Sequence, residues 1–426
     1  MVKDTLLNIL SASWRFAQSV DWLIYILVAT GIFFFARSWW LFWRQEDYKH
    51  RIRWKFIEIK VPREVLKGPK AMEQFFQELA PLANRPGTIW KKWLDGEIVR
   101  YHTIDIIGRN NEVRFFMRIS DRILPAVEGF LYGQYPEIEI VHCEDPLKEF
   151  PQTYKELSSQ GYEIWGNELL QGKSPSISIK TYNEFEQLQG DEKGRIIDPF
   201  SVLLELISNL KPSEMILVQF MLNPDTSHSP WKDEAKKILE EFRNTTQQLG
   251  EDKEGNPQYR FRFRTPGEEG VIKRLEEKVE RATFETTIRY IYLAPKEIYN
   301  FNIGYRGIQT FFNQFRHDRQ SLDRNFSVMT KAEWYYVPFI FPGTRLYWRR
   351  HAFWRKYMER FLPEHTFASK LFESHFWAWA FSHHPPILSS EELATLFHIP
   401  TNVVLTAPSM ERIESKRLAP PSHLPT

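Results

Sequence analysis

Cysteine is nearly absent from this chain, because Cys143 is the only one among 426 residues. A single thiol excludes an internal disulfide and any metal site built from several thiolates. It also fits a protein that folds in a reducing compartment. Cys143 ends an alternating apolar run, residues 138–143. We therefore interpret it as a small hydrophobic residue in a core.

The chain also has no excess of charge of either sign. It contains 56 Lys and Arg against 54 Asp and Glu, which gives a net charge of +2. This balance excludes a uniformly basic coat for nucleic acid, although local basic patches stay compatible with it. Hydrophobic residues make up 42% of the chain and aromatic residues 15%, so we expect two or three globular domains.

No phosphate-binding loop is present. The nearest approach runs from Gly166 to Gly172, Lys173 and Ser174, with five residues between the glycines where the motif needs four. Pro175 and an alternating segment follow, whereas the motif requires a helix N-terminus there. We expect a turn between strands. The chain has no Gly-x-Ser-x-Gly elbow and no dinucleotide fingerprint either.

The histidines do not have the spacing of metal ligands. Six of the twelve fall late in the chain, and no two of these six are four residues apart. These late histidines are His351, His365, His375, His383, His384 and His398. We therefore predict no catalytic residue, no cofactor and no metal, and we do not expect an enzyme.

Residues 22–43 form the longest apolar run, and it includes one charge. Twenty-two helical residues extend about 33 Å, enough to cross the hydrocarbon core of a bilayer. Tryptophans stand at both ends, where their rings favour the membrane interface. We predict one transmembrane helix over residues 21–43. The anchor residues that we assign are Trp22, Arg37, Trp39, Trp40 and Trp43.

Basic residues are more frequent after this run than before it. Lys3 and Arg15 precede it, and Arg44, Lys49, Arg51, Arg53 and Lys55 follow it. The positive-inside rule then predicts an outer N-terminus and cytoplasmic C-terminal domains. A cleaved signal peptide fits poorly, since the run starts late and is too long. A hairpin inside a soluble core is the remaining alternative. Residues 1–20 are expected to form a short amphipathic helix on the membrane.

An α+β domain is predicted over residues 52–145. Alternating segments indicate strands, amphipathic segments indicate helices, and residues 108–111 indicate a hairpin turn. The order β-α-β-β-α-β is that of the ferredoxin-like fold. The predicted strands are 54–61, 97–107, 113–119 and 138–143, and the helices are 69–83 and 123–135.

A second α+β sandwich domain is predicted over residues 160–320, and it resembles a diverged copy of the first in its alternation of elements. Whether it forms one domain or two stays open. A polar loop is expected at 244–258. The predicted strands are 162–170, 176–181, 215–222 and 284–293, and the helices are 200–210, 232–242, 271–281 and 298–315.

Residues 330–400 are expected to form a helical, aromatic-rich region, with RLYWRRHAFWRKYMER at 345–360. Basic residues interleaved with aromatic ones are typical of single-stranded nucleic-acid binding and also of anionic membrane surfaces. Alternatively, the aromatic residues pack a core while the arginines face water or a partner. The candidate contact residues are Arg345, Arg349, Arg350, Trp354, Arg355, Lys356 and Arg360.

The segment LSSEELATLFHIP at 388–400, followed by Ala407-Pro408 and the Pro-rich residues 420–425, resembles a segment of HerA-like and conjugative coupling-type ATPases. In that family the segment lies directly before the P-loop motor domain. Shorter stretches resemble the membrane-anchored region that accompanies such ATPases in type IV secretion-like loci. These stretches are 61–62, 69–73, 93–97, 127–128, 132–136, 218–224 and 231–232.

The resemblance implies a non-catalytic, single-pass module of the bacterial cytoplasmic membrane. Such a module anchors or orients a P-loop translocase ATPase that is encoded separately or was removed from this chain. Ser389 or Ser390 is expected to cap a short docking helix. Residues 401–426 would form a stiff Pro-rich linker towards the motor. The candidate docking residues are Glu391, Glu392, Leu393, Leu396, Phe397 and His398.

The expected partners are the ATPase and the lipid bilayer, with nucleic acid contacted only indirectly. Whether the protein forms homo-oligomers, and whether the cargo is DNA or protein, stays open. The alternative function is a stand-alone module that binds a membrane surface or single-stranded nucleic acid through residues 345–360.

Overall fold

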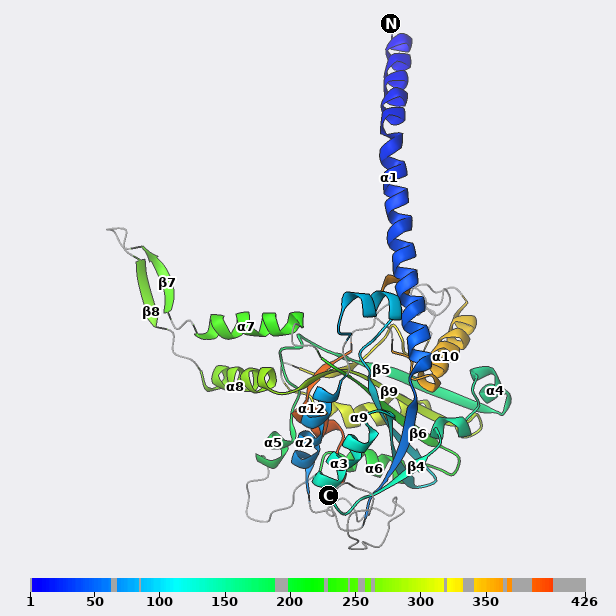
Figure 1. Ribbon diagram of the computed structural model, residues 1–426, viewed down its shortest axis with the longest axis vertical. Helices are drawn as coiled ribbons and strands as arrows, with labels where there is room; N and C mark the ends of the chain where they lie inside the picture. The colour runs from blue at the N-terminus through cyan, green and yellow to red at the C-terminus, as the bar shows by residue number, and fades with distance from the viewer. Residues whose placement is uncertain are drawn as a thin grey trace. The chain divides into compact units, whose positions relative to one another are not determined.

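The computed structural model describes residues 2–62, 67–83, 86–187, 198–225, 229–243, 246–251, 257–261, 265–317, 320–331, 341–362, 366–369 and 385–400 (Figure 1). These residues form two compact units, one built on the N-terminal helix and one on a β-sheet. The unit of the N-terminal helix also contains residues 86–98 and 366–369. The predicted Pro-rich tail, residues 401–426, lies outside the described residues.

Helix α1 (Val2–Arg51) contains the whole predicted span. The sequence predicts a separate surface helix over residues 1–20, but the backbone forms one helix of 50 residues. No proline occurs in it, and its first glycine is Gly31, so nothing in the sequence breaks the helix before the apolar run.

The first half of the sheet unit contains six elements in the predicted order, although the strand predicted over 97–107 begins only at His102. All neighbouring strands are antiparallel, and their order across the sheet is β4-β1-β3-β2. Asn110 and Asn111 have φ of 51° and 62°, as a tight turn between β2 and β3 requires. The elements are β1 (Trp54–Lys60), α2 (Pro69–Leu79), β2 (His102–Arg109), β3 (Glu112–Ser120), α3 (Leu124–Gln134) and β4 (Glu139–Cys143).

The second half repeats this arrangement, with strand order β10-β5-β9-β6. In this half β5 takes the place of β1, β6 that of β2, β9 that of β3 and β10 that of β4. Residues 176–181 form no strand, so that prediction is wrong, and the predicted helix 298–315 divides into η4 (Ile303–Gly307) and α9. The other elements are β5 (Tyr162–Gln171), α5 (Tyr182–Gln187), α6 (Ser201–Ser208), β6 (Met215–Pro224), β9 (Thr283–Pro295), α9 (Ile308–Asn313) and β10 (Leu322–Arg324).

The two predicted domains share one sheet, because β2 pairs antiparallel with β6. The register places His102 opposite Leu222 and Arg109 opposite Met215. Each half thus covers the strand edge that the other leaves open. The prediction of an α+β protein with an apolar N-terminal helix and an antiparallel sheet is confirmed.

The halves differ in the connection between their second and third strands. The first half has the Asn110-Asn111 turn, and the second has two helices, α7 (Pro230–Arg243) and α8 (Pro266–Glu280). Between these helices, β7 (Thr246–Glu251) pairs with β8 (Pro257–Phe261) in the stretch predicted as a loop. Trp231, Ala235 and Leu275 are buried where α7 packs on α8.

Both faces of the sheet are covered. Helices α2, α3, α6, α9 and α12 (Ser390–Leu396) contribute to the core on one face. The other face packs against η3 (Pro146–Glu149), α4 (Tyr154–Ser159) and α10 (Pro342–Met358). Strand β11 (Ile387–Ser389) pairs with the start of β9 and leads directly into α12. In Figure 1 the long sheet strands run beneath the gold helix α10.

Candidate functional site

Among the described residues, α1 is the one helix that is long and apolar enough to span a membrane. The predicted tryptophan anchors are exposed, with 58% of Trp22, 47% of Trp39, 46% of Trp40 and 54% of Trp43 accessible. The apolar side chains between them, such as Tyr25 and Leu27, are exposed as well. Without a bilayer, such a surface would leave a large apolar area in water.

A short segment that contains helix η2 (Lys91–Asp95) packs on the C-terminal part of α1. Trp40 Nε1 donates to the carbonyl of Trp93 at 3.0 Å, and Arg44 Nε donates to that of Leu94 at 2.5 Å. The Arg37 guanidinium lies 4.5 Å from the centre of the Trp93 ring. Arg37, placed in the span by the sequence, is therefore held by a cation–π contact.

This segment also carries an apolar surface that we did not predict. Ile89 is 75% exposed, Trp90 72% and Leu94 52%. At Gly96, φ is +71°, and a Cβ there would lie 2.1 Å from the carbonyl oxygen of Arg44, so only glycine fits. The signal in the sequence was two tryptophans flanking Lys91 and Lys92, a pattern typical of membrane interfaces.

The basic and aromatic segment 345–360 lies in α10 and its C-terminal end, and much of it is buried. Arg345, Trp354, Lys356 and Arg360 are at most 4% exposed, so they form no basic surface in this structure. Trp354 Nε1 donates to the carbonyl of Pro151 at 2.9 Å. Of the interpretations left open by the sequence, packing of the aromatic residues in a core agrees with this burial.

The two neighbouring arginines of α10 make internal contacts. Arg350 pairs with Glu163 at 2.8 Å. Arg349 Nη1 donates to the carbonyls of Met329 and Lys331 at 3.1 and 2.8 Å. Of the seven candidate contact residues, Arg355 and Arg360 line a cavity.

Arg360 joins three parts of the sheet unit. Its Nη1 and Nη2 donate to Asp145 at 2.8 Å each, and its Nε donates to Asp105 at 2.9 Å. Burial alone would lower the pKa of Arg360, but Asp105 and Asp145 outweigh burial and raise it. Gln219 donates to the second oxygen of Asp105 at 2.9 Å. These bonds fix the end of α10 against β2 and β6.

A second buried arginine supports the same end of α10. Arg289 Nε pairs with Glu168 at 2.9 Å, and both side chains are at most 2% exposed. Arg289 Nη1 donates to the carbonyl of Phe361 at 2.8 Å. Arg289 and Arg360 thus each have a carboxylate partner on a strand of the sheet, Glu168 and Asp105.

The predicted docking helix exists as α12. Ser389 caps it, and Ser389 with Glu392 forms a capping box, as the sequence pattern predicts. All six candidate docking residues are at most 5% exposed, however, so in this structure they offer no surface to a partner. Leu393, Leu396 and Phe397 contribute to the chain's own core.

The polar residues of α12 are paired inside the protein. Glu392 accepts from Lys278 Nζ at 2.9 Å, with each side chain 1% exposed. Glu391 pairs with Arg281, and burial raises its pKa. His398 Nε2 lies 2.8 Å from an oxygen of Asp198. The sequence of this segment shows which residues are charged and which are apolar, but it does not show that both faces of the helix are buried.

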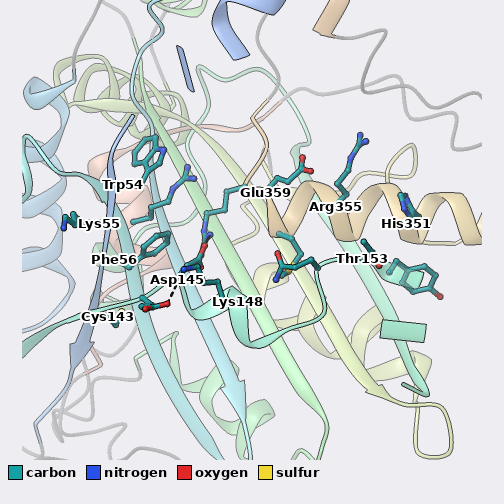
Figure 2. A pocket seen from close by; sticks show the side chains of 16 residues that line it. Trp54, Lys55, Phe56, Cys143, Asp145, Lys148, Thr153, His351, Arg355 and Glu359 are labelled. Carbon is teal, nitrogen blue, oxygen red and sulfur yellow. Dashed lines mark hydrogen bonds and ion pairs between the residues drawn. The ribbon is translucent and has the colours of Figure 1, made fainter. Parts of the chain in front are cut away.

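A cavity of about 890 Å³ lies between the sheet and α10, and we call it the α10 cavity. Figure 2 shows Trp54 and Phe56 on one side and His351 and Arg355, which project from α10, on the other. The lining residues are Trp54, Lys55, Phe56, Arg118, Cys143, Glu144, Asp145, Lys148, Gln152, Thr153, Tyr154, His351, Arg355, Met358, Glu359 and Arg360.

The ionisable groups around the α10 cavity differ in their pairing. Lys148 pairs with Glu144 at 3.2 Å in an exposed contact. Asp145 is bonded to Arg360. Burial raises the pKa of Cys143 to about 11, so its thiol is neutral and unreactive near pH 7. Cys143 is half-buried rather than fully packed in a core.

Arg118, on β3, was not singled out in the sequence. Its guanidinium carbon lies 4.2 Å from the centre of the Trp54 ring and 5.0 Å from that of Tyr101. Burial lowers the pKa of Arg118. Burial, with Arg118 and Arg100, also lowers the pKa of His102 to about 4, so this imidazole is neutral at pH 7.

The described residues contain no group of three or more His, Cys, Asp or Glu side chains that could hold a metal ion. Of the late histidines, His365, His375, His383 and His384 lie outside the described part of the chain. Comparison with protein-family models and with curated proteins finds no match to this chain.

Proposed function

We propose that this chain is a membrane-tethered module that anchors or orients a P-loop translocase ATPase in a conjugation or type IV secretion-like system. The observation that supports the tether is α1, whose exposed side chains from Tyr25 to Phe35 are apolar apart from Thr30. Lys49, His50 and Arg51 form its basic last turn. By the positive-inside rule, the sheet unit then lies in the cytoplasm of a bacterium and the N-terminus outside.

The exposed Ile89 and Trp90 support the tether. They belong to the same compact unit as α1, and the segment that carries them is bonded to α1 through Trp40 and Arg44. Tryptophan prefers the headgroup region of a bilayer. In this proposal they lie at the membrane surface beside the end of the span.

The fold of the proposed module is two fused ferredoxin-like halves. The support is the strand order, β4-β1-β3-β2 in one half and β10-β5-β9-β6 in the other, with neighbouring strands antiparallel. In both halves the chain order of strands and helices is β-α-β-β-α-β, apart from the inserted α7–α8 region. A duplicated half explains this agreement without any repeat of residues.

The ATPase as partner rests on the resemblance of residues 388–400. Because α12 is buried, the contact would have to come from residues that follow it or from another surface of the sheet unit. A truncation after Pro386 would remove β11 and α12 from the core and so test folding rather than docking. A truncation after Pro400 leaves this core complete and removes only residues 401–426.

The experiment is an affinity purification of the tagged full-length protein from detergent-solubilised native membranes, with co-purifying proteins identified by mass spectrometry. We expect a stoichiometric P-loop ATPase with the full chain and less of it after truncation at Pro400. A variant in which residues 401–426 are scrambled controls for length. Recovery of the protein without an ATPase at low and moderate salt would contradict the proposal.

One observation supports the alternative function, which is binding of a membrane surface or single-stranded nucleic acid through residues 345–360. Arg355 and His351 line the α10 cavity. Triple replacement of Arg349, Arg350 and Arg355 by Gln should weaken salt-dependent binding to anionic vesicles or single-stranded DNA if this function is correct. Unchanged binding would exclude it.

A further inference from the structure

Two segments that are far apart in the chain pack against the C-terminal part of α1, and we call them the collar. They are residues 86–98 and 366–369, which belong to the same compact unit as α1. The first accepts the two hydrogen bonds from α1 that are described above. In the second, the backbone N–H of Ala368 donates to Ser38 Oγ at 2.9 Å. Both segments are therefore fixed on α1 itself.

Each collar segment exposes large apolar side chains although it packs on α1. Ile89, Trp90 and Leu94 of the first segment are more than half exposed, and so is Phe367 of the second. The described part of the whole sheet unit exposes no more large apolar side chains than these two short segments do. Those of the sheet unit are Val202, Phe326, Phe341 and Tyr347. Such a concentration in so short a stretch indicates an interaction surface.

Lys91 and Lys92 stand among the apolar side chains of the first segment. Both are exposed, and neither forms an ion pair with another described residue. The unit of α1 is also basic here, since its described residues from 37 onwards contain more Lys and Arg than Asp and Glu. The cations are Arg37, Arg44, Lys49, Arg51, Lys91 and Lys92, and the anions are Glu46, Asp47, Asp95 and Glu97.

The backbone of the collar belongs to the headgroup layer of a bilayer. Residues 86–88 form no helix or strand. Irregular backbone that faces lipid does not occur in the hydrocarbon core, because its N–H and C=O groups would have no partner there. On α1 the contacts with the collar begin at Arg37, directly after the exposed apolar side chains that end with Phe35. In the proposed tether the collar therefore lies beside the end of the hydrocarbon core.

We propose that the collar is a binding surface for anionic phospholipids. Ile89, Trp90 and Phe367 enter the border between headgroups and acyl chains, and Lys91 and Lys92 contact the phosphates. The occupant follows from the charge and from the continuity with the candidate span, because a second copy would bring the same positive charge to this surface. The proposal rests on the membrane tether and adds the class of lipid that the tether selects.

The test measures which lipid gathers beside the collar of the full-length protein. Gly87→Cys in a Cys143→Ser background carries a fluorescent dye, and the protein is placed in nanodiscs of phosphatidylcholine. Gly87 is exposed and a Cβ there would meet nothing within 4 Å, so the label leaves the fold and the lysines unchanged. The quenchers are phosphatidylglycerol and phosphatidylcholine, each with a nitroxide at the same acyl position and at the same mole fraction.

We expect the phosphatidylglycerol probe to quench the dye at least about threefold more strongly than the phosphatidylcholine probe, because each lysine at the surface attracts an anionic lipid. Replacing Lys91→Gln and Lys92→Gln together should at least halve this ratio. The matched control is Lys91→Arg with Lys92→Arg, which keeps both charges and should keep the ratio. These four positions of charge are exposed, so none of the variants disturbs the core.

Equal quenching by the two probes, or a full ratio in the glutamine variant, would overturn the proposal. If neither probe quenches although the protein elutes with the nanodiscs, the collar lies off the membrane, and this inference fails while the tether stands. Self-quenching between two labelled copies in one disc, without quenching by lipid, would assign the surface to a second copy and also overturn the proposal. A chain that does not enter the nanodiscs would overturn the tether as well.

Discussion

Arg360 holds Asp145 through two parallel hydrogen bonds of 2.8 Å, although 215 residues separate them in the chain. The same guanidinium bonds to Asp105, so one side chain ties the end of α10 to β2 and to the residue that caps η3.

Replacing Arg360 by Gln should lower the free energy of unfolding by about 3–5 kcal/mol, because it leaves Asp105 as a buried carboxylate without its cation. Chemical denaturation followed by tryptophan fluorescence measures this loss. Lys148→Gln breaks an ion pair whose side chains are 68% and 87% exposed, and it should cost less than about 1 kcal/mol. Equal losses in both variants would contradict the role of Arg360.

Gly166 should not tolerate a methyl group. A Cβ there would lie 2.4 Å from Cε1 of Phe353, whose ring packs in the core beneath α10. We expect Gly166→Ala to destabilise the fold by about 1–3 kcal/mol through overpacking. The control is Gly129→Ala in α3, where nothing lies within 4 Å of the new atom and a gain of about 0.5–1 kcal/mol is expected. The midpoints of thermal unfolding should therefore move in opposite directions.

His102 and His398 should change the pH dependence of stability with opposite sign. The pKa of His102 falls to about 4 in the fold from 6.5, so its contribution is complete above pH 6.5 and is lost as the pH falls towards 4. The loss amounts to about 3 kcal/mol. His102→Leu should flatten the acid side of a plot of unfolding free energy against pH.

For His398, burial alone would lower the pKa, but Asp198 and the carbonyl of Ala394 outweigh burial and raise it. Its contribution is therefore complete below pH 6.5 and is lost as the pH rises through the folded pKa. His398→Gln should remove this loss on the alkaline side. A slope unchanged in both variants would show that neither imidazole is linked to folding.

Trp90 should contact lipid. In a Cys143→Ser background, Trp90→Cys labelled with an environment-sensitive dye should be quenched by nitroxide lipids in nanodiscs, because the tryptophan position is exposed beside the candidate span. The reference is the same labelled variant in nanodiscs without nitroxide lipids. Equal fluorescence with and without the nitroxide would refute the interfacial placement of residue 90.

Truncation after Pro400 should leave the fold intact, whereas truncation after Pro386 should abolish it. The shorter chain loses Glu392, which would leave Lys278 as a buried ammonium without its carboxylate, and it opens the core around Leu393. Limited proteolysis of both chains checks this. Equal protease resistance would mean that α12 is dispensable for the core.

Local patterns were sufficient for the elements of the first half. The alternation at residues 54–61, the proline that starts α2 and the Asn110-Asn111 turn each act within a few residues, and the strands and helices form there. The β7–β8 hairpin was missed because its polar sequence, with glycines at 250 and 255, is equally typical of a loop.

The candidate site could not be predicted in the same way. The pairing of Arg360 with Asp105 and Asp145 depends on residues far apart in the chain. The amphipathic segment at 388–400 looked like a surface helix because a sequence shows hydrophobic positions but not how many sides are covered.

The bond between Gln77 and Ser390 spans 313 residues, and α12 packs in the same core as Ile57 of β1. During synthesis, α1 and the first half leave the ribosome long before the segment that completes their core. At about 5–20 residues per second, the incomplete sheet would wait for tens of seconds. Until residue 399 has been synthesised, the apolar residues of the first half that share this core, such as Ile57, lack the cover that α12 provides.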